Sequence, residues 1–294
     1  MIQQFRFLKN YIEQINAKGG PVEEDYPSLD RWIRQAHHYG PTPQEREEMF
    51  QSILDKNSPS LFNRIFYTPR GYAGSFDIMQ NLYNNQVEPT VSSTLKKWDQ
   101  FIVVQMSSVA VRNRLKKIKD FCHDANSWKS FLDVACGPGL ALATLHINHP
   151  TNNFSYVGVD QDPDAIAYCG RYKYIENARF KTIPFLSMTP ETIGVSDIVW
   201  CSGFFDYIVT RKGFMGAARR LIDLSKQTVI IGNMGPYNLS RPLMEMLGWR
   251  LTYRTKEELL VIGEELRRKY GCIKHISVTS DDTGIQHYLS LTLK

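Results

Sequence analysis

The sequence predicts an α/β protein in which a mostly parallel sheet carries helices on both faces and follows a helical N-terminal region. Three observations support this prediction. From residue 129 onward, short apolar runs alternate with helical patterns, the order typical of a parallel sheet. The stretch SFLDVACGPGLALA at 130–143 reads as a buried strand, a tight glycine turn and the start of a helix. A second apolar strand at 154–160 ends in an acid.

The first 126 residues carry helical patterns and are expected to form a separate helical domain or lid. Residues 1–17 place apolar side chains at steps of three and four, which predicts an amphipathic helix ended by the Gly-Gly-Pro sequence at 19–21. We interpret its apolar face as a packing face, and a homodimer contact is the alternative. Ser28 is expected to cap a helix that runs to Tyr39.

A capping box at 42–45 opens a further helix, which is expected to end near Asp55. The stretch 90–125 is rich in helix formers and aromatic residues, and it suits one long helix or two shorter ones. Asn126 and Ser127 are the expected linker into the sheet domain, which is predicted to span 127–294.

The second domain should contain five strands followed by a closing pair. The five strands are predicted at 130–135, 155–160, 178–183, 196–201 and 227–232. The helices between and after them are predicted at 139–147, 163–175, 211–224 and 239–246. A capping box at 255–258 opens another helix that ends near Tyr270, and 272–278 and 286–293 are expected to form an antiparallel pair.

Length and composition set limits on function. The 294 residues carry 35 basic and 30 acidic side chains, and a net charge of +5 is too slight to indicate a nucleic-acid partner. Five cysteines without a Cys-x-x-Cys pair predict neither a disulfide framework nor a zinc site. Polar residues interrupt the apolar N-terminal stretch, so neither a signal peptide nor a membrane span is expected. A cytoplasmic protein that acts on a small molecule fits these features best.

The glycine turn and the acids around it indicate a nucleoside site. Gly137 and Gly139 allow the backbone to turn sharply and to approach a ligand closely. Asp160 follows Asp133 by 27 positions (160 − 133), and a carboxylate in that place can accept both hydroxyls of a ribose. The full G-x-G-x-x-G pattern of pyrophosphate sites is absent, and Asp133 precedes the turn. An acid beside the turn suits a cationic ligand better than a pyrophosphate.

The sequence DVACGPG at 133–139 resembles the first motif of class I S-adenosylmethionine (SAM) dependent methyltransferases, and DQDP at 160–163 resembles their second. The resemblance implies a Rossmann-like sheet of seven strands with the last one reversed, and SAM as the cofactor. It also implies that the glycine turn receives the amino-carboxypropyl arm of SAM and that Asp160 holds the ribose. Ala135, which replaces the first glycine of the usual pattern, and Gln161 belong to the cofactor site on the same grounds. The alternative is a Rossmann turn that binds another nucleoside, or no ligand.

Ligands of open α/β sheets bind at the carboxyl ends of the strands. Ser202, Tyr207 and Asn233 follow predicted strands and could exchange hydrogen bonds with the cofactor or an acceptor. Phe185 could stack on adenine. Tyr174 lies near the end of a predicted helix, where it could face the cofactor or solvent.

The segment 67–75, YTPRGYAGS, breaks the helical pattern with a proline, two glycines, an arginine and two tyrosines. Loops held by a rigid scaffold often carry binding groups. Arg70 could pair with a carboxylate of SAM or of an acceptor, and Tyr72 could pack on a ring or donate a hydrogen bond. A purely structural turn is the equal alternative. Asp206, in contrast, is expected to cap the helix that follows it.

A narrower resemblance covers about 69–259. The sequences PRGYAG at 69–74, AVRNR at 110–114 and GFFDY at 203–207 are similar to those of a methyltransferase group associated with 3-hydroxypalmitic acid methyl ester biosynthesis. Ser75 stands where that group usually has an aspartate. The resemblance implies a methyltransferase with an acid acceptor, and the departure at Ser75 concerns both the acceptor and the reaction.

Two reactions of SAM fit these residues. The first is methylation of a carboxylic acid oxygen on a small molecule or fatty acid, where the enzyme mainly supplies alignment and removal of water. The second is attack within SAM on its own amino-carboxypropyl chain to give azetidine-2-carboxylate, or transfer of that chain, with release of methylthioadenosine. Tyr72, Tyr174, Ser202 and Asn233 are the candidate catalytic residues. A SAM-binding protein without catalysis is a third interpretation.

Overall fold

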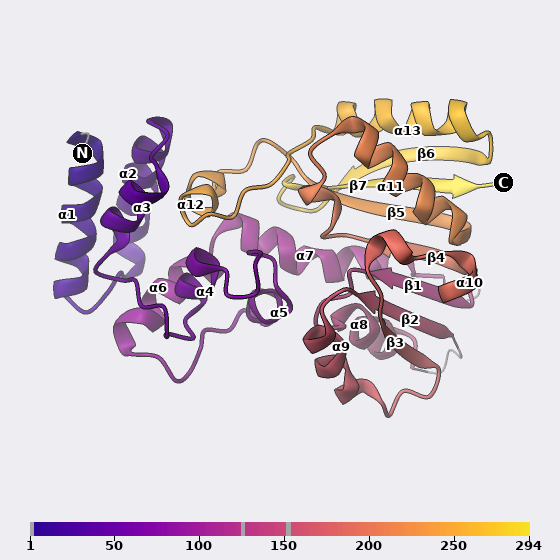
Figure 1. The fold of residues 1–294 in the computed structure, drawn as a ribbon, viewed down its shortest axis with the longest axis horizontal. Helices are drawn as coiled ribbons and strands as arrows, with labels where there is room; N and C mark the ends of the chain where they lie inside the picture. Colours follow the sequence, from indigo (N-terminus) through magenta and orange to yellow (C-terminus); the bar gives the residue numbers. More distant parts are fainter. Residues whose placement is uncertain (1–2, 125–126, 151–153) are drawn as a thin grey trace. The chain divides into compact units, whose positions relative to one another are not determined.

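The computed structural model describes residues 3–124, 127–150 and 154–294, which pack as two compact units (Figure 1). Unit 1 comprises the residues up to Arg112 together with Asn238–Arg250, and unit 2 comprises Asn113–Tyr237 and Leu251–Lys294. The sequence predicts two domains that are each continuous in sequence and meet at residue 126. In the structure each unit is instead built from two separate segments of the chain. The expected linker begins at Asn126, which lies outside the described residues.

The described residues of unit 1 are mainly helical. Its elements are α1 (Gln3–Ala17), the 3-10 turn η1 (Glu23–Asp25), α2 (Tyr26–His38), α3 (Pro43–Phe50), α4 (Leu61–Tyr67), α5 (Phe76–Asn84), α6 (Ser93–Val103), the start of α7 (Met106–Phe121) and α12 (Arg241–Met246). The amphipathic helix at the N-terminus is confirmed from residue 3 onward, since Phe5, Leu8 and Ile12 are buried. The stretch 90–125 forms two helices, α6 and α7, which is one of the two arrangements expected.

The start of α2 differs from the prediction. The helix begins at Tyr26, so Ser28 lies inside it and does not cap it. Pro27 occupies the first turn, where a missing N–H costs no helical hydrogen bond. The chain therefore enters α2 directly from the preceding 3-10 turn, before Ser28 is reached.

The end of α3 also differs from the prediction. The helix opens with the expected capping box at Thr42 but ends at Phe50, short of Asp55. The side chain of Asn63 accepts a hydrogen bond from the Asp55 N–H at 2.7 Å and donates one to the Ile53 carbonyl at 3.3 Å. After Phe50 the chain makes one further turn, with the Ile53 N–H donating to the Phe50 carbonyl at 2.8 Å, and the Asn63 contacts then tie residues 53–55 to α4.

Contacts with α12 join Asn238–Arg250 to unit 1. Arg46 of α3 donates from Nη1 to the carbonyl oxygens of Glu245 (3.3 Å) and Met246 (3.1 Å), which satisfies acceptors at the end of α12. Nε2 of His37 lies 2.7 Å from the carboxylate of Glu245. Thus a segment that is distant in sequence packs with the N-terminal helices.

The described part of unit 2 contains a seven-stranded sheet in the order β3-β2-β1-β4-β5-β7-β6. The strands are β1 (Ser130–Val134), β2 (Ser155–Asp160), β3 (Ala178–Thr182), β4 (Ser196–Cys201), β5 (Ser225–Met234), β6 (Ile273–Ser280) and β7 (Gln286–Leu293). β7 runs antiparallel to β5 and β6, and the other neighbours are parallel. The predicted strands, the closing pair and the reversed last strand are confirmed.

Helices cover both faces of this sheet, as predicted (Figure 1). They are α8 (Leu140–Asn148), α9 (Pro163–Cys169), α10 (Pro190–Ile193), α11 (Arg211–Asp223), α13 (Lys256–Tyr270) and the later part of α7, with the 3-10 turns η2 (Gly170–Tyr172), η3 (Phe185–Ser187) and η4 (Phe205–Tyr207). One core contains Phe214 and Leu259, and the other contains Ile118 and Leu142. The helix predicted at 163–175 ends at Cys169, because Gly170 follows it and the chain tightens into η2.

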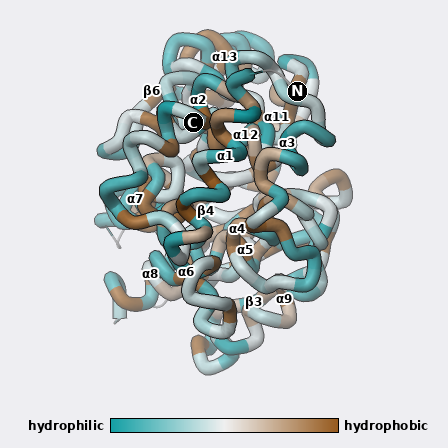
Figure 2. Tube along the Cα trace, turned by 90° about the vertical axis from the view of Figure 1, so that its left-hand side faces the viewer, coloured by the Kyte–Doolittle hydropathy of each residue, from teal (hydrophilic) through white to brown (hydrophobic). Residues whose placement is uncertain are grey.

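Apolar and polar residues both occur along the helices that pack on the sheet. The trace of α7, for example, carries both brown and teal segments in Figure 2. Within the described residues, no helix combines the length and the apolar composition needed to cross a bilayer.

Candidate functional site

The glycine turn lies at the carboxyl end of β1, which has β2 on one side and β4 on the other. Three of its residues have positive φ, namely Ala135 (57°), Gly137 (50°) and Gly139 (71°). The Cys136 N–H donates to the Val159 carbonyl at 3.0 Å, which attaches the turn to the end of β2. The local sequence thus forms the strand, turn and helix that it predicts.

The two glycines of the turn meet different surroundings. A Cβ on Gly139 would lie 2.9 Å from Cys169 Sγ and 3.0 Å from a ring carbon of Tyr172, so glycine is needed for close packing there. A Cβ on Gly137 would find no heavy atom within 4 Å. The space beside Gly137 is therefore open to a ligand.

Asp160 ends β2 and faces the turn. One carboxylate oxygen accepts from the Gly137 N–H at 2.9 Å, and the other accepts from the Asp162 N–H at 3.0 Å. Burial raises the pKa of this carboxyl, and the N–H donors oppose the rise without cancelling it. Each carboxylate oxygen keeps a second lone pair, so Asp160 can still accept hydrogen bonds from a ligand. Its role toward a ribose stays a prediction.

Asp133 is a buried carboxyl on β1. Its Oδ2 accepts from the Tyr156 hydroxyl at 2.7 Å. Burial raises the pKa of Asp133 to about 7, and the charge of Asp160 acts in the same direction. A cation near two such carboxyls would favour their ionised forms, and they would in turn stabilise the cation.

Ser202 lies just beyond β4, as the sequence predicts. Its Oγ accepts from the indole Nε1 of Trp200 at 3.0 Å, and the hydroxyl can still donate its proton. A Cβ on Gly232 would lie 2.8 Å from Ser202 Cα, so glycine allows the ends of β4 and β5 to approach closely.

Asn233 is completely buried near the end of β5. Its Nδ2 donates to Asp206 Oδ1 at 3.0 Å and to the Thr252 carbonyl at 2.9 Å. Its Oδ1 accepts from Arg254 Nη1 at 2.6 Å. These contacts favour a structural role for Asn233 at the carboxyl end of β5, and a catalytic role stays a prediction.

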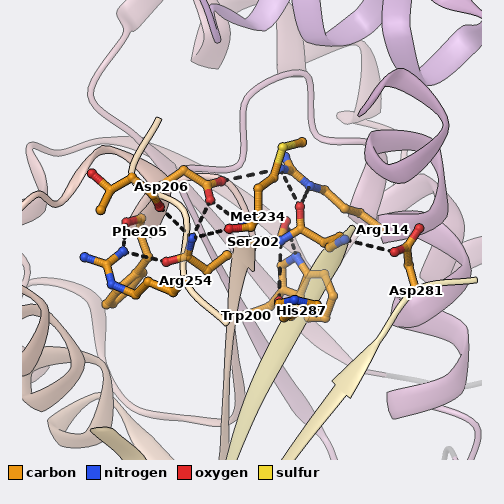
Figure 3. Close-up of polar contacts among 12 residues, drawn as sticks. Arg114, Trp200, Ser202, Phe205, Asp206, Met234, Arg254, Asp281 and His287 are labelled. Carbon is orange, nitrogen blue, oxygen red and sulfur yellow. Dashed lines mark hydrogen bonds and ion pairs between the residues drawn. The ribbon is translucent and has the colours of Figure 1, made fainter. Parts of the chain in front are cut away.

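Asp206 does not cap α11, and the prediction that it would is wrong. Thr210 caps this helix by accepting from the Gly213 N–H at 3.1 Å. Asp206 is buried in η4, where its Oδ1 accepts from the Met234 N–H at 2.6 Å and its Oδ2 lies 3.6 Å from Arg114 Nη2 (Figure 3). Thr210 directly precedes the helix, whereas Asp206 is drawn inward by donors on β5 and α7.

Two buried guanidinium groups flank Asp206 (Figure 3). Arg114 on α7 donates from Nε (3.1 Å) and Nη2 (2.9 Å) to Gln286 Oε1 on β7. Arg254 donates from Nη1 to the Phe205 carbonyl at 3.2 Å. Burial raises the pKa of Asp206 to about 6, although both arginines oppose this rise. The network ties α7, the turn after β4, the end of β5 and the start of β7 together.

The other residues predicted in the cofactor site differ in exposure. Phe185 is buried and stacks on Phe204 with ring centroids 4.3 Å apart, so one face of its ring is already covered. Tyr174 is 69% exposed and lies beyond α9, outside the helix expected to carry it. Gln161 is exposed directly after β2, and Tyr207 is 39% exposed in η4.

Arg70 and Tyr72 lie in unit 1, in the irregular segment between α4 and α5. Arg70 Nε is 3.5 Å from Asp77 Oδ1, and the guanidinium carbon lies 4.7 Å from the centroid of the Phe76 ring. Ser75 is the N-cap residue of α5. The roles of Arg70 and Tyr72 toward SAM or an acceptor stay predictions.

Unit 2 therefore brings Asp133, Gly137 and Asp160 to one place at the ends of β1 and β2. The buried ion pair of Arg114 and Asp206 was missed by sequence reasoning, because no local pattern distinguishes a buried charge from an exposed one. The sequence did mark both residues, because Arg114 lies in AVRNR and Asp206 lies in GFFDY, two of the segments that carry the narrower resemblance.

No protein-family model and no curated protein matches the chain. Among solved structures, a possible exported protein from Bordetella parapertussis aligns with a TM-score of 0.64 at 14% identity, covering 94% of this chain and 98% of the other. An O-methyltransferase family protein from Burkholderia thailandensis aligns with a TM-score of 0.51 at 15% identity, covering 90% and 72%. At these identities the likeness concerns the fold alone. The fold is the Rossmann-like α/β fold that the sequence predicts.

Proposed function

We propose that the chain is a SAM-dependent methyltransferase that methylates a carboxylic acid oxygen on a small molecule or a fatty acid. The observation that supports it most is the Asp160 carboxylate beside the open glycine turn, held by the N–H groups of Gly137 and Asp162. A carboxylate oriented in this way is suited to the hydroxyls of a ribose. The fold shared with an O-methyltransferase family protein is consistent with methyl transfer.

The charge of the site supports a cationic nucleoside. Asp133 and Asp160 are both buried, and both have a raised pKa. A pyrophosphate would add negative charge beside them, whereas the sulfonium and the ammonium of SAM would each relieve the mutual repulsion. SAM is therefore a better ligand for this turn than a dinucleotide.

The proposed reaction asks the protein mainly for alignment. SAM, when bound, supplies a methyl group activated by its positive sulfonium. A carboxylate acceptor is already ionised at neutral pH and needs no general base. The Ser202 hydroxyl, just beyond β4, can donate a hydrogen bond to an acceptor oxygen and orient it. The hydrogen bonds around Asp206 hold the neighbouring chain at the carboxyl ends of β4 and β5 in place.

Attack within the amino-carboxypropyl chain of SAM is the alternative reaction, and it is less well supported. Its candidate groups include Asn233, whose amide already serves protein contacts, and Tyr174, whose side chain is 69% exposed. Two incubations distinguish the reactions, one with SAM alone and one with SAM and added carboxylic acids. Methylthioadenosine above the spontaneous background would favour the alternative, whereas S-adenosylhomocysteine formed only with added carboxylic acids would support methylation.

Loss of the Asp160 carboxylate tests the nucleoside site itself. Two hydrogen bonds from ribose hydroxyls to a charged acceptor contribute about 1.5–3 kcal/mol each, so Asp160→Ala should weaken SAM binding by about a hundredfold or more. Titration calorimetry measures the affinity, and circular dichroism checks that the fold is intact. Asp223→Ala is the matched control, because Asp223 forms a surface ion pair with Arg219 at the end of α11. Wild-type SAM affinity in Asp160→Ala would overturn the assignment.

A further inference from the structure

Cys136 and Cys169 place two thiols beside one carbonyl group of the glycine turn. Cys136 belongs to the turn, whereas Cys169 is the last residue of α9, 33 positions later (169 − 136). The Cys169 thiol donates to the Gly137 carbonyl oxygen at 3.4 Å, and Cys136 Sγ lies 4.0 Å from the same oxygen. All five cysteines of the chain are free. The fold therefore brings together two reduced thiols that are distant in sequence.

The two thiols differ in their access to solvent. Cys169 is completely buried, whereas 7% of Cys136 remains exposed, and the space beside the adjacent Gly137 is open. An oxidant as small as a peroxide can therefore reach Cys136 first, and Cys169 is in place to react with the product. Contact with the Cys169 thiol raises the pKa of Cys136, and burial adds to the rise. Because the thiolate is the reactive form, the pair should stay reduced until an oxidant is in excess.

Gly137 connects the thiol pair with Asp160. Its N–H donates to the Asp160 carboxylate at 2.9 Å, and its carbonyl accepts from Cys169. Gly137 has φ 50° and no side chain, so these two hydrogen bonds decide how it is oriented. A disulfide has no S–H group, and it brings its two sulfur atoms to about 2 Å from each other. Its formation would remove the donor to the Gly137 carbonyl and shift the turn relative to Asp160.

We propose that Cys136 and Cys169 form a redox switch, in which a disulfide between them disrupts the contact of the turn with Asp160 and closes the nucleoside site. The effect on SAM rests on the proposed function, because it takes SAM as the ligand of that site. The formation of the disulfide does not depend on the ligand.

The oxidant of this switch is hydrogen peroxide. The Cys136 thiolate attacks one oxygen atom of the peroxide, which breaks the O–O bond and leaves a sulfenic acid on Cys136. The released hydroxide takes up the proton that the thiol has lost and becomes water. The Cys169 thiol then attacks the oxidised sulfur and displaces a second water. Two thiols and one peroxide thus give one disulfide and two waters.

Peptide mapping by mass spectrometry tests the disulfide directly. The full chain is treated with excess hydrogen peroxide in the absence of SAM and digested without a reductant. A cross-link between the peptides of Cys136 and Cys169 is expected, and dithiothreitol should remove it. Cys169→Ser should give no such cross-link, and its Cys136 should instead advance to the sulfinic acid, because the second thiol is missing.

Titration calorimetry, after removal of the peroxide, measures the effect on SAM. Oxidised wild-type protein should bind SAM about tenfold more weakly, because a hydrogen bond to the charged Asp160 is lost, and dithiothreitol should restore the affinity. Cys136→Ser keeps a side chain of similar size but has no thiol that peroxide can reach at this position, so treatment should not change its affinity. Cys272→Ser is the matched control, because it removes a partly exposed thiol next to β6 and should respond as the wild type does.

The outcomes distinguish this inference from the function on which it rests. The absence of a cross-link between Cys136 and Cys169 would overturn the inference. A cross-linked protein that binds SAM as tightly as the reduced one would overturn it as well. Failure of the reduced protein to bind SAM would refute the proposed function and the effect on SAM with it. The mass spectrum tells these failures apart, because the cross-link forms whether or not SAM binds.

Discussion

Replacement of Asp133 by asparagine should stabilise the ligand-free protein at pH 8 and have little effect at pH 5. The substitution keeps the size of the side chain and an oxygen that can accept from the Tyr156 hydroxyl, 2.7 Å away in the wild type. It removes an ionisable group that is buried beside Asp160. The difference between the two proteins therefore reports the cost of charging Asp133.

The magnitude follows from the pKa of Asp133, which burial raises from 3.8 to about 7. Below pH 3.8 the carboxyl is neutral in both folded and unfolded states. Between pH 3.8 and about 7 only the unfolded state releases the proton, so the folded protein loses stability as pH rises. The full penalty above pH 7 is about 4 kcal/mol, from about three pKa units at about 1.4 kcal/mol each.

The asparagine has a cost of its own. Burial of its NH2 group without an acceptor costs about 1–3 kcal/mol at any pH. The net gain in unfolding free energy should therefore be about 2 kcal/mol at pH 8 and near zero at pH 5, where the penalty on the carboxyl is only partly developed.

Urea unfolding of both proteins at pH 5 and pH 8 measures these values. Other carboxyls with a raised pKa, such as Asp206, are present in both proteins and cancel in the difference. Asp223→Asn is the control for the substitution itself, because this carboxylate is exposed at the end of α11. A pH-independent difference for Asp133→Asn would refute the reasoning that burial has raised its pKa.

Three further substitutions test the packing of unit 2. Gly139→Ala should lower the unfolding free energy by about 3 kcal/mol, from left-handed strain and overpacking against Cys169, whereas Gly137→Ala should cost only about 1 kcal/mol because no atom lies near its Cβ. Equal losses in urea unfolding would contradict the difference in their surroundings. Asp206→Ala should cost about 3–5 kcal/mol, because it leaves the Arg114 guanidinium buried without its carboxylate. A loss below about 1 kcal/mol would show that the ion pair is dispensable.

The elements of unit 2 could be predicted from the sequence because their signals are local. The apolar run before Gly137 is short, as in a buried strand, and the glycines mark the turn. The capping box at Thr255 is formed as predicted, with the Glu258 N–H donating to Thr255 Oγ1 at 3.2 Å. In each case the residues that decide the structure lie within a few positions of one another.

The predictions that differ from the structure were decided by distant contacts. The helix predicted to reach Asp55 ends before it, and Asn63, on the next helix, instead accepts the hydrogen bond of the Asp55 N–H. Asp206 was expected to cap α11, but an N–H group on β5 and the guanidinium of Arg114 on α7 hold it inside the protein. Neither partner is close in sequence, so no window of neighbouring residues contains the information.

The sequence by itself determined the strands, the glycine turn and the acids that flank it, because hydrophobic spacing and glycine conformation act over a few residues. Only the tertiary structure decided that Asp133 is buried deeply enough to raise its pKa to about 7, and that Asn238–Arg250 belongs to unit 1. Burial and charge depend on every group that the fold brings near. That sum over distant residues is available only when the chain is folded.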